Sequence, residues 1–182
     1  MSRIQKVVQQ RVTPGGKLLI PYLVAGDPDL QITLELMHAL VQAGADIIEL
    51  GMPFSDPSSD GAVIQQGSER ALASGTTLAG VLALVKKFRT TNEQTAVVLM
   101  GYLNPVEIMG YEEFAQACAA AGVDGVLLVD MPPGESGRLT GLLREQQIDS
   151  VFLVAPTTSA ERAAAIVARC SGYLYYVSLK GV

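Results

Sequence analysis

The strongest evidence for the fold of this chain is the stretch Ala45-Asp46-Ile47-Ile48-Glu49-Leu50-Gly51, followed at once by Met52-Pro53-Phe54-Ser55-Asp56-Pro57-Ser58-Ser59-Asp60-Gly61. The first part is an apolar run typical of a strand buried on both faces, and the second is rich in turn formers. A carboxylate at the end of a buried strand costs desolvation energy, and in barrels of strands and helices that end carries the chemistry. The stretch therefore predicts an ionisable group with a raised pKa at Glu49, and a second carboxylate, Asp60, one loop away.

The composition is that of a layered α/β protein with a sizeable core: 182 residues, 49% hydrophobic, with a formal net charge of -5. The negative charge argues against nucleic-acid binding, whereas one phosphate held by loop amides or a helix N-terminus stays compatible with it. Cys118 and Cys170 lack metal-ligand spacing, so we expect no metal site and free thiols in a reducing cytoplasm. There is no signal-peptide core and no apolar run of membrane-spanning length, which predicts a soluble, cytoplasmic protein without membrane contact.

Short apolar runs recur along the chain with helical patterns between them, as expected of repeated βα units. The predicted strands are Leu18 to Val24, Asp46 to Leu50, Ala96 to Met100, Gly125 to Val129, Ser150 to Val154 and Tyr173 to Ser178. The predicted helices are Arg3 to Arg11, Gln31 to Gln42, Ala62 to Ala73, Thr77 to Arg89, Tyr111 to Ala121, Gly137 to Glu145 and Ala160 to Ala168.

Two architectures fit these units: an open, doubly wound sheet and a (β/α)8 TIM barrel. No Gly-x-Gly-x-x-Gly turn follows the first strand, which weighs against a dinucleotide-binding sheet. Polar residues do follow the strands, which favours a barrel with its site at the carboxyl end and with the first helix capping the opposite end. Six strands do not close without exposed edges, and barrels take about 250 residues. We therefore expect residues 1–182 to form one barrel domain that supplies about the first six βα units and lacks the last two.

Several motifs resemble the tryptophan synthase α-chain family, in matching order and spacing. They are Ile20-Pro21-Tyr22-Leu23-Val24-Ala25-Gly26-Asp27-Pro28, Ile48 to Pro57, Ser59-Asp60-Gly61, Val98 to Pro105, Gly122-Val123-Asp124-Gly125, Phe152 to Thr158 and Tyr175-Tyr176-Val177-Ser178-Leu179. The resemblance implies a (β/α)8 barrel, a carbon–carbon lyase that cleaves indole-3-glycerol phosphate to indole and glyceraldehyde 3-phosphate without a metal or organic cofactor. It also implies that the indole passes to a partner β chain in an α2β2 complex. Pyridoxal phosphate belongs to that partner.

The resemblance gives roles to individual residues. Glu49 would move protons to and from the substrate, because a carboxyl with a raised pKa exchanges protons near neutral pH. Asp60 would accept the indole N–H and stabilise the charge that develops on the ring. From sequence alone Glu49 is equally compatible with a structural carboxylate. For Asp60 the sequence alone favours an ordinary turn residue, and its spacing from Glu49 within the family motif reverses that preference.

The remaining expected roles concern the pocket and the partner. Tyr175 would support Glu49, and the indole pocket would be lined by Tyr22, Met100 and Leu127, all of which are equally plausible as core residues. The contacts with the β chain would come from Asp56, Pro57 and the turn at Asn104-Pro105. His38 is expected to be a surface or satisfied histidine.

The chain departs from the family pattern at three positions: Ser59 and Ala62 replace the usual Ala and Pro beside Asp60, and Lys180 replaces a small polar residue. The phosphate-binding loops of the family follow strands seven and eight, which lie beyond this sequence. Three rival hypotheses follow: a stand-alone lyase that releases free indole, a catalytically silent scaffold partner, and another phosphate-binding barrel.

Overall fold

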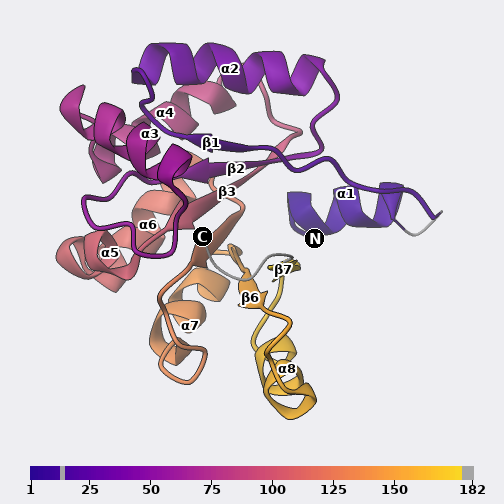
Figure 1. Cartoon of the computed structure of the whole chain (residues 1–182). Coiled ribbons are helices and arrows are strands. Elements are labelled where there is room, and N and C mark those ends of the chain that lie inside the picture. Colours follow the sequence, from indigo (N-terminus) through magenta and orange to yellow (C-terminus); the bar gives the residue numbers. More distant parts are fainter. Residues whose placement is uncertain (13–14, 178–182) are drawn as a thin grey trace.

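The computed structural model describes residues 1–12 and 15–177. Its centre is a parallel sheet of β1 (Tyr22–Val24), β2 (Ile47–Gly51), β3 (Ala96–Gly101), β4 (Gly125–Leu128) and β5 (Asp149–Ser150), in that order (Figure 1). A second parallel pair joins β6 (Phe152–Val154) to β7 (Leu174–Tyr176). The strand order follows the chain without reversal. A doubly wound sheet reverses its order at a switch point, so this order is that of a partial barrel, as predicted.

Helices cover the outside of this curved sheet (Figure 1). The predicted ones are present as α2 (Leu30–Gln42), α3 (Ala62–Ala73), α4 (Leu78–Arg89), α6 (Tyr111–Ala121), α7 (Gly137–Glu145) and α8 (Ala160–Val167). The prediction of a turn at Asn104-Pro105 is wrong, because both residues lie in α5 (Leu103–Met109). Pro105 is accepted there because backbone N–H groups in a first helical turn have no intrahelical acceptor.

The helix α1 (Arg3–Arg11) closes the amino-terminal end of the strands, as predicted (Figure 1). It begins with a capping box at Ser2, and the Arg3 guanidinium donates to the Asp124 carboxylate at 2.9 Å. Ile4 is completely buried and packs against interior strand residues. The helix therefore forms the floor of the barrel.

Side chains alternate along each strand between two apolar clusters, because successive strand residues point to opposite faces. Ile48 and Leu50 of β2 belong to the cluster under the helices. Ile47 belongs to the interior cluster, together with Val98 and Leu127 of the neighbouring strands. The interior cluster forms the base on which the polar residues at the carboxyl ends of the strands stand.

Two predicted strands differ in detail. The first is regular only over Tyr22–Val24 rather than from Leu18, because Pro21 has no N–H to donate. Upstream, the carbonyls of Pro21 and Leu19 still accept from the N–H groups of Glu49 and Asp46, each at 2.9 Å. The fifth is divided at Val151: β5 pairs with β4, and β6 pairs with β7. The sixth predicted strand extends to Ser178, which lies outside the described residues.

Within residues 1–12 and 15–177, no single helix is long and apolar enough to cross a membrane. The pair α3 and α4 passes by length and composition together but is bent by 93°. Cys118 is buried and Cys170 is half-buried, and neither forms a disulfide. His38 is half-buried: its ring packs against the Phe88 ring with centroids 5.0 Å apart, and its Nε2 lies 3.4 Å from the Thr91 hydroxyl oxygen.

Candidate active site

The carboxylate of Glu49 stands at the carboxyl end of β2 with only 4% of the residue exposed. Its Oε1 accepts a hydrogen bond from the Tyr173 hydroxyl at 2.5 Å. Burial raises the pKa of Glu49 above the usual 4.5, and the hydrogen bond from Tyr173 offsets part of that rise. Glu49 is therefore a carboxyl group able to hold and release a proton closer to neutral pH than an ordinary glutamate.

Asp60 lies at the end of the loop that follows β2. Its Oδ2 accepts from the Tyr102 hydroxyl at 2.9 Å, and its backbone carbonyl accepts from Gln65 Nε2 at 2.8 Å. Burial also raises the pKa of Asp60, while the Tyr102 hydrogen bond lowers it. The Glu49 carboxyl group thus comes from the carboxyl end of β2, and the Asp60 carboxyl group from the loop that follows β2.

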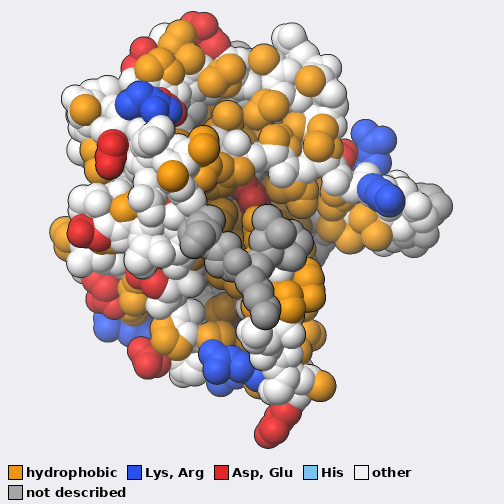
Figure 2. Space-filling model, in the orientation of Figure 1, with side chains coloured by type: hydrophobic (Ala, Val, Ile, Leu, Met, Phe, Trp, Pro, Cys, Tyr) orange, Lys and Arg blue, Asp and Glu red, His pale blue; other side chains and the backbone are white. Residues whose placement is uncertain are grey.

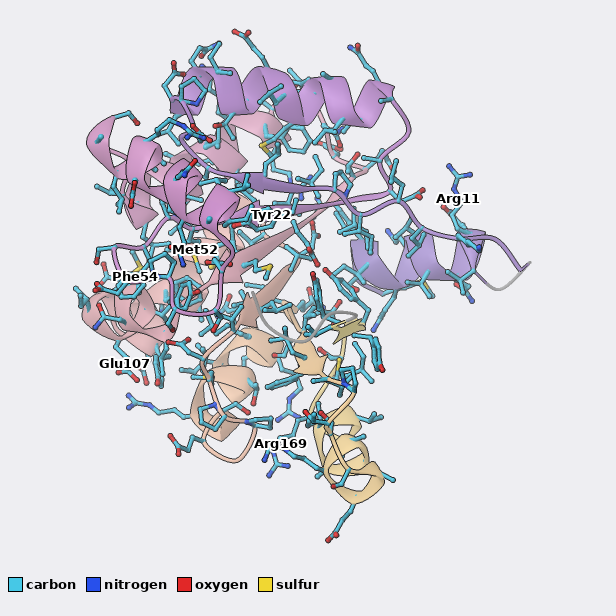
Figure 3. All side chains as sticks on the ribbon, viewed as in Figure 1. Arg11, Tyr22, Met52, Phe54, Glu107 and Arg169 are labelled. Atoms are coloured by element: carbon cyan, nitrogen blue, oxygen red, sulfur yellow. The ribbon has the colours of Figure 1, made fainter. Side chains whose placement is uncertain are left out.

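Tyr22 on β1 occupies the space near both carboxyl groups. Tyr22 is paired in register with Glu49 on the neighbouring strand β2. Its phenol ring lies across Gly51, so that a Cβ added at Gly51 would be 2.1 Å from the Tyr22 hydroxyl oxygen. Its pKa is raised by burial and by the nearby charges of Asp60 and Glu49. In Figure 3, Tyr22 lies over the strands, while Met52 and Phe54 lie further out toward α5.

A hollow of about 400 Å³ opens between the carboxyl ends of β4 and β6, and its lining includes Val129, Asp130, Leu153 and Thr158. Val129 and Leu153 also pack against the interior cluster, so the hollow borders the inside of the barrel. Figure 2 shows hydrophobic side chains gathered over the central face, with most charged side chains toward the edges. Within the described part of the chain, no cluster of three or more His, Cys, Asp or Glu could hold a metal ion. None of Glu49, Asp60, Tyr22, Tyr102 and Tyr173 lines the hollow of about 400 Å³, so it is separate from the residues that hold the two carboxyl groups.

Comparisons with known proteins identify the family. The model of the tryptophan synthase alpha chain family matches residues 8–182. The chain is 59% identical over 182 residues to the tryptophan synthase alpha chain of Marinobacter nauticus, covering all of this chain and 67% of that one. The chain belongs to the tryptophan synthase α-chain family.

Solved structures of family members agree with this assignment. The α subunit from Legionella pneumophila is 48% identical, with a TM-score of 0.95, covering 99% of this chain and 70% of that one. A chain in the tryptophan synthase complex of Pyrococcus furiosus is 44% identical, with a TM-score of 0.84. The match covers 87% of this chain and 65% of that one. The described strands thus correspond to part of the TIM barrel of the tryptophan synthase α chain.

The predicted pocket residues lie on the inner side of the sheet. Met100 and Tyr175 are half-buried and pack against the interior cluster. Tyr22 is also half-buried and packs against Gly51. Leu127 has no exposed surface at all. Their contact with indole stays a prediction.

The predicted partner residues lie on the outside. Asp56 and Asn104 are exposed and Pro57 is half-buried, on the loop after β2 and on α5. Ile108, also on α5, is 79% exposed. Among the departures from the family pattern, Ser59 and Ala62 are exposed, and Lys180 lies outside the described residues.

Two tyrosines of the site were missed from the sequence. Tyr173 rather than Tyr175 makes the hydrogen bond to Glu49, and Tyr102 makes the one to Asp60. The signal was the alternation of strand residues: Tyr173 shares a face with Tyr175, and Tyr102 shares one with Met100. Applied to every strand, that rule would have placed both tyrosines inside.

Proposed function

We propose that this α chain cleaves indole-3-glycerol phosphate to indole and glyceraldehyde 3-phosphate at the carboxyl ends of its strands, within one barrel domain that includes residues 1–182. The observation that carries the proposal is the Glu49 carboxyl group, nearly buried, hydrogen-bonded by Tyr173 and accompanied by Asp60. The family assignment supports the same reaction.

The reaction needs a proton on C3 of the indole ring and removal of a proton from the neighbouring hydroxyl group. The protonated Glu49 donates to C3, which makes the ring an electron sink. The resulting carboxylate then accepts the hydroxyl proton as the C3–C3′ bond breaks and its electrons return to the ring. Burial raises the pKa of Glu49 toward the range in which one group performs both transfers.

Asp60 stabilises the intermediate. Protonation at C3 leaves positive charge on the ring nitrogen, and a carboxylate that accepts the N–H stabilises that charge in a water-poor site. This chemistry needs no metal and no organic cofactor on the α chain. Tyr22 and Met100 supply apolar walls for the indole ring.

The partner of the chain is a tryptophan synthase β chain, which would hold the pyridoxal phosphate, in an assembly that acts in the cytoplasm. A relative from Pyrococcus furiosus is described as part of an a2b2 complex. In this chain the exposed residues Asp56, Asn104 and Ile108 lie on neighbouring segments outside the site. Asp56→Lys should weaken co-purification with a β chain. Full retention would remove the role of Asp56, and failure of the unmodified chain to co-purify with a β chain would argue for a stand-alone lyase.

The experiment that tests the lyase activity is Glu49→Gln with indole formation as the readout. We expect loss of about 10³-fold or more, because an amide neither donates nor accepts the transferred proton. Glu113→Gln is the matched control, because Glu113 is exposed on the outer helix α6. Turnover retained in Glu49→Gln would refute the role of Glu49, and no substrate binding by the unmodified chain would favour the scaffold hypothesis.

A further inference from the structure

Tyr102 is a buried phenol with two hydrogen-bonding partners on one loop. It follows β3 directly, precedes α5 and is 4% exposed. Its hydroxyl oxygen accepts from the Ser59 backbone N–H at 2.9 Å, and its hydroxyl proton is donated to Asp60 Oδ2 at 2.9 Å. A phenol has one proton, so the direction of the second bond is fixed.

The phenol itself is held in place. Its ring packs against Phe54 with centroids 5.3 Å apart and an interplanar angle of 32°. Burial and Asp60 raise the pKa of Tyr102 to about 12, so the hydroxyl keeps its proton at neutral pH. Tyr102 is therefore a permanent donor anchored to the strand scaffold, while Asp60 belongs to a loop.

The bond from Tyr102 defines how the Asp60 carboxylate presents its oxygens. The terminal torsion of an aspartate is broad and roughly two-fold, so an unbound carboxylate rotates with little resistance. Here Oδ2 is bound to Tyr102, and no donor within the described residues reaches Oδ1. The backbone carbonyl of Asp60 is bound to Gln65 Nε2, which fixes the other end of the residue. One oxygen thus stays available for a ligand.

We propose that Tyr102 is a positioning residue that aims Asp60 Oδ1 at the N–H of the indole ring and thereby contributes to the specificity of the site for indole. This role rests on the proposed function, because it needs Asp60 to accept the ring N–H. Tyr102 acts through Asp60 and touches no reacting atom.

The test compares two ligands that differ only at the ring nitrogen: indolepropanol phosphate and its benzofuran counterpart, in which oxygen replaces N–H. A hydrogen bond from a ligand N–H to a carboxylate corresponds to about tenfold or more in affinity. We expect the full chain to prefer the indole ligand by about that factor in a calorimetric titration. In Tyr102→Phe, which keeps the ring against Phe54, we expect the preference to fall below about threefold.

Controls separate this role from a structural one. Tyr176→Phe removes a phenol that is 60% exposed and should leave the preference unchanged. Asp60→Ala should abolish the preference, and adding Tyr102→Phe to it should change nothing further, because the two residues act as one unit. A general loss of stability would lower both affinities together and leave their ratio intact.

Two results would overturn the inference in distinguishable ways. A ratio in Tyr102→Phe equal to that of the unmodified chain, with Asp60→Ala reduced, would remove the role of Tyr102 and leave the proposed function standing. A ratio near one in the unmodified chain would mean that Asp60 does not accept the N–H. The roles of Tyr102 and Asp60 would then both fail, whereas the lyase proposal would still be decided by indole formation in Glu49→Gln.

Discussion

Gly51 is the position where one added methyl group should disturb the site most directly. It lies on β2, two residues after Glu49, with backbone angles that any residue adopts in a strand. An alanine Cβ there would be 2.1 Å from the Tyr22 hydroxyl oxygen, 2.6 Å from Cζ and 3.0 Å from Cε2. Ordinary contact begins near 3.4 Å, so the phenol must move by about 1 Å or more.

The size of the effect follows from that displacement. Overpacking of this kind costs about 1–3 kcal/mol of stability. A displacement of about 1 Å within a site costs up to about 10²-fold in rate. Because Tyr22 is paired in register with Glu49 and lies near Asp60, we expect Gly51→Ala to reduce indole formation by about tenfold to 10²-fold.

The assay combines chemical unfolding with indole formation. Gly141→Ala is the control: that glycine lies within α7 with no atom near an added Cβ, so alanine should stabilise the fold by up to about 1 kcal/mol. In a Tyr22→Leu background, which removes the clashing hydroxyl and ring, Gly51→Ala should cost less than about 0.5 kcal/mol. Unchanged stability and activity in Gly51→Ala alone would refute the packing argument.

Two further predictions concern stability. Burial raises the pKa of Glu49, so the folded state holds a proton that the unfolded state releases above the usual value of 4.5, and this contribution to stability is lost as pH rises. The unfolding midpoint of Glu49→Gln should therefore exceed that of the unmodified chain by more at about pH 8 than at about pH 4; a constant difference would contradict a raised pKa. Ile4→Ala should lower the free energy of unfolding by about 2–5 kcal/mol in urea titrations, because Ile4 is completely buried. A loss below about 1 kcal/mol would show that the neighbouring residues close the cavity left by the missing side chain.

The parts of the fold that depend on local pattern could be predicted from the sequence. The apolar run that ends at Leu50 and the turn formers after it fixed both the strand and the loop. The order of the strands could not be obtained that way, because sheet pairing joins residues far apart in the chain. The barrel itself was expected from the polar strand ends and the family resemblance, and the strand order confirms it. The turn predicted at Pro105 was wrong because the local signal is ambiguous. A proline is common both in turns and in the first turn of a helix, and here it lies in α5.

The candidate site was predictable in part for the same reason. Glu49 and Asp60 belong to one continuous stretch, so family motifs identify both together. The hydrogen bond from Tyr173 to Glu49 joins residues 124 positions apart, and the bond from Tyr102 to Asp60 spans 42 positions. Such partners are determined by the closure of the sheet, and sequence spacing carries no direct record of them.

The interior of the barrel links stability to chemistry along a single strand face. At the α1 end, Ile4 and Ile47 form a floor without exposed surface. One step further along the same face of β2 stands Glu49, and the floor beneath it excludes the water that would otherwise solvate its carboxylate. The apolar packing that holds the barrel together is thus also the cause of the raised pKa. A substitution that let water into the floor would lower that pKa toward its usual value and weaken proton donation before the fold was lost.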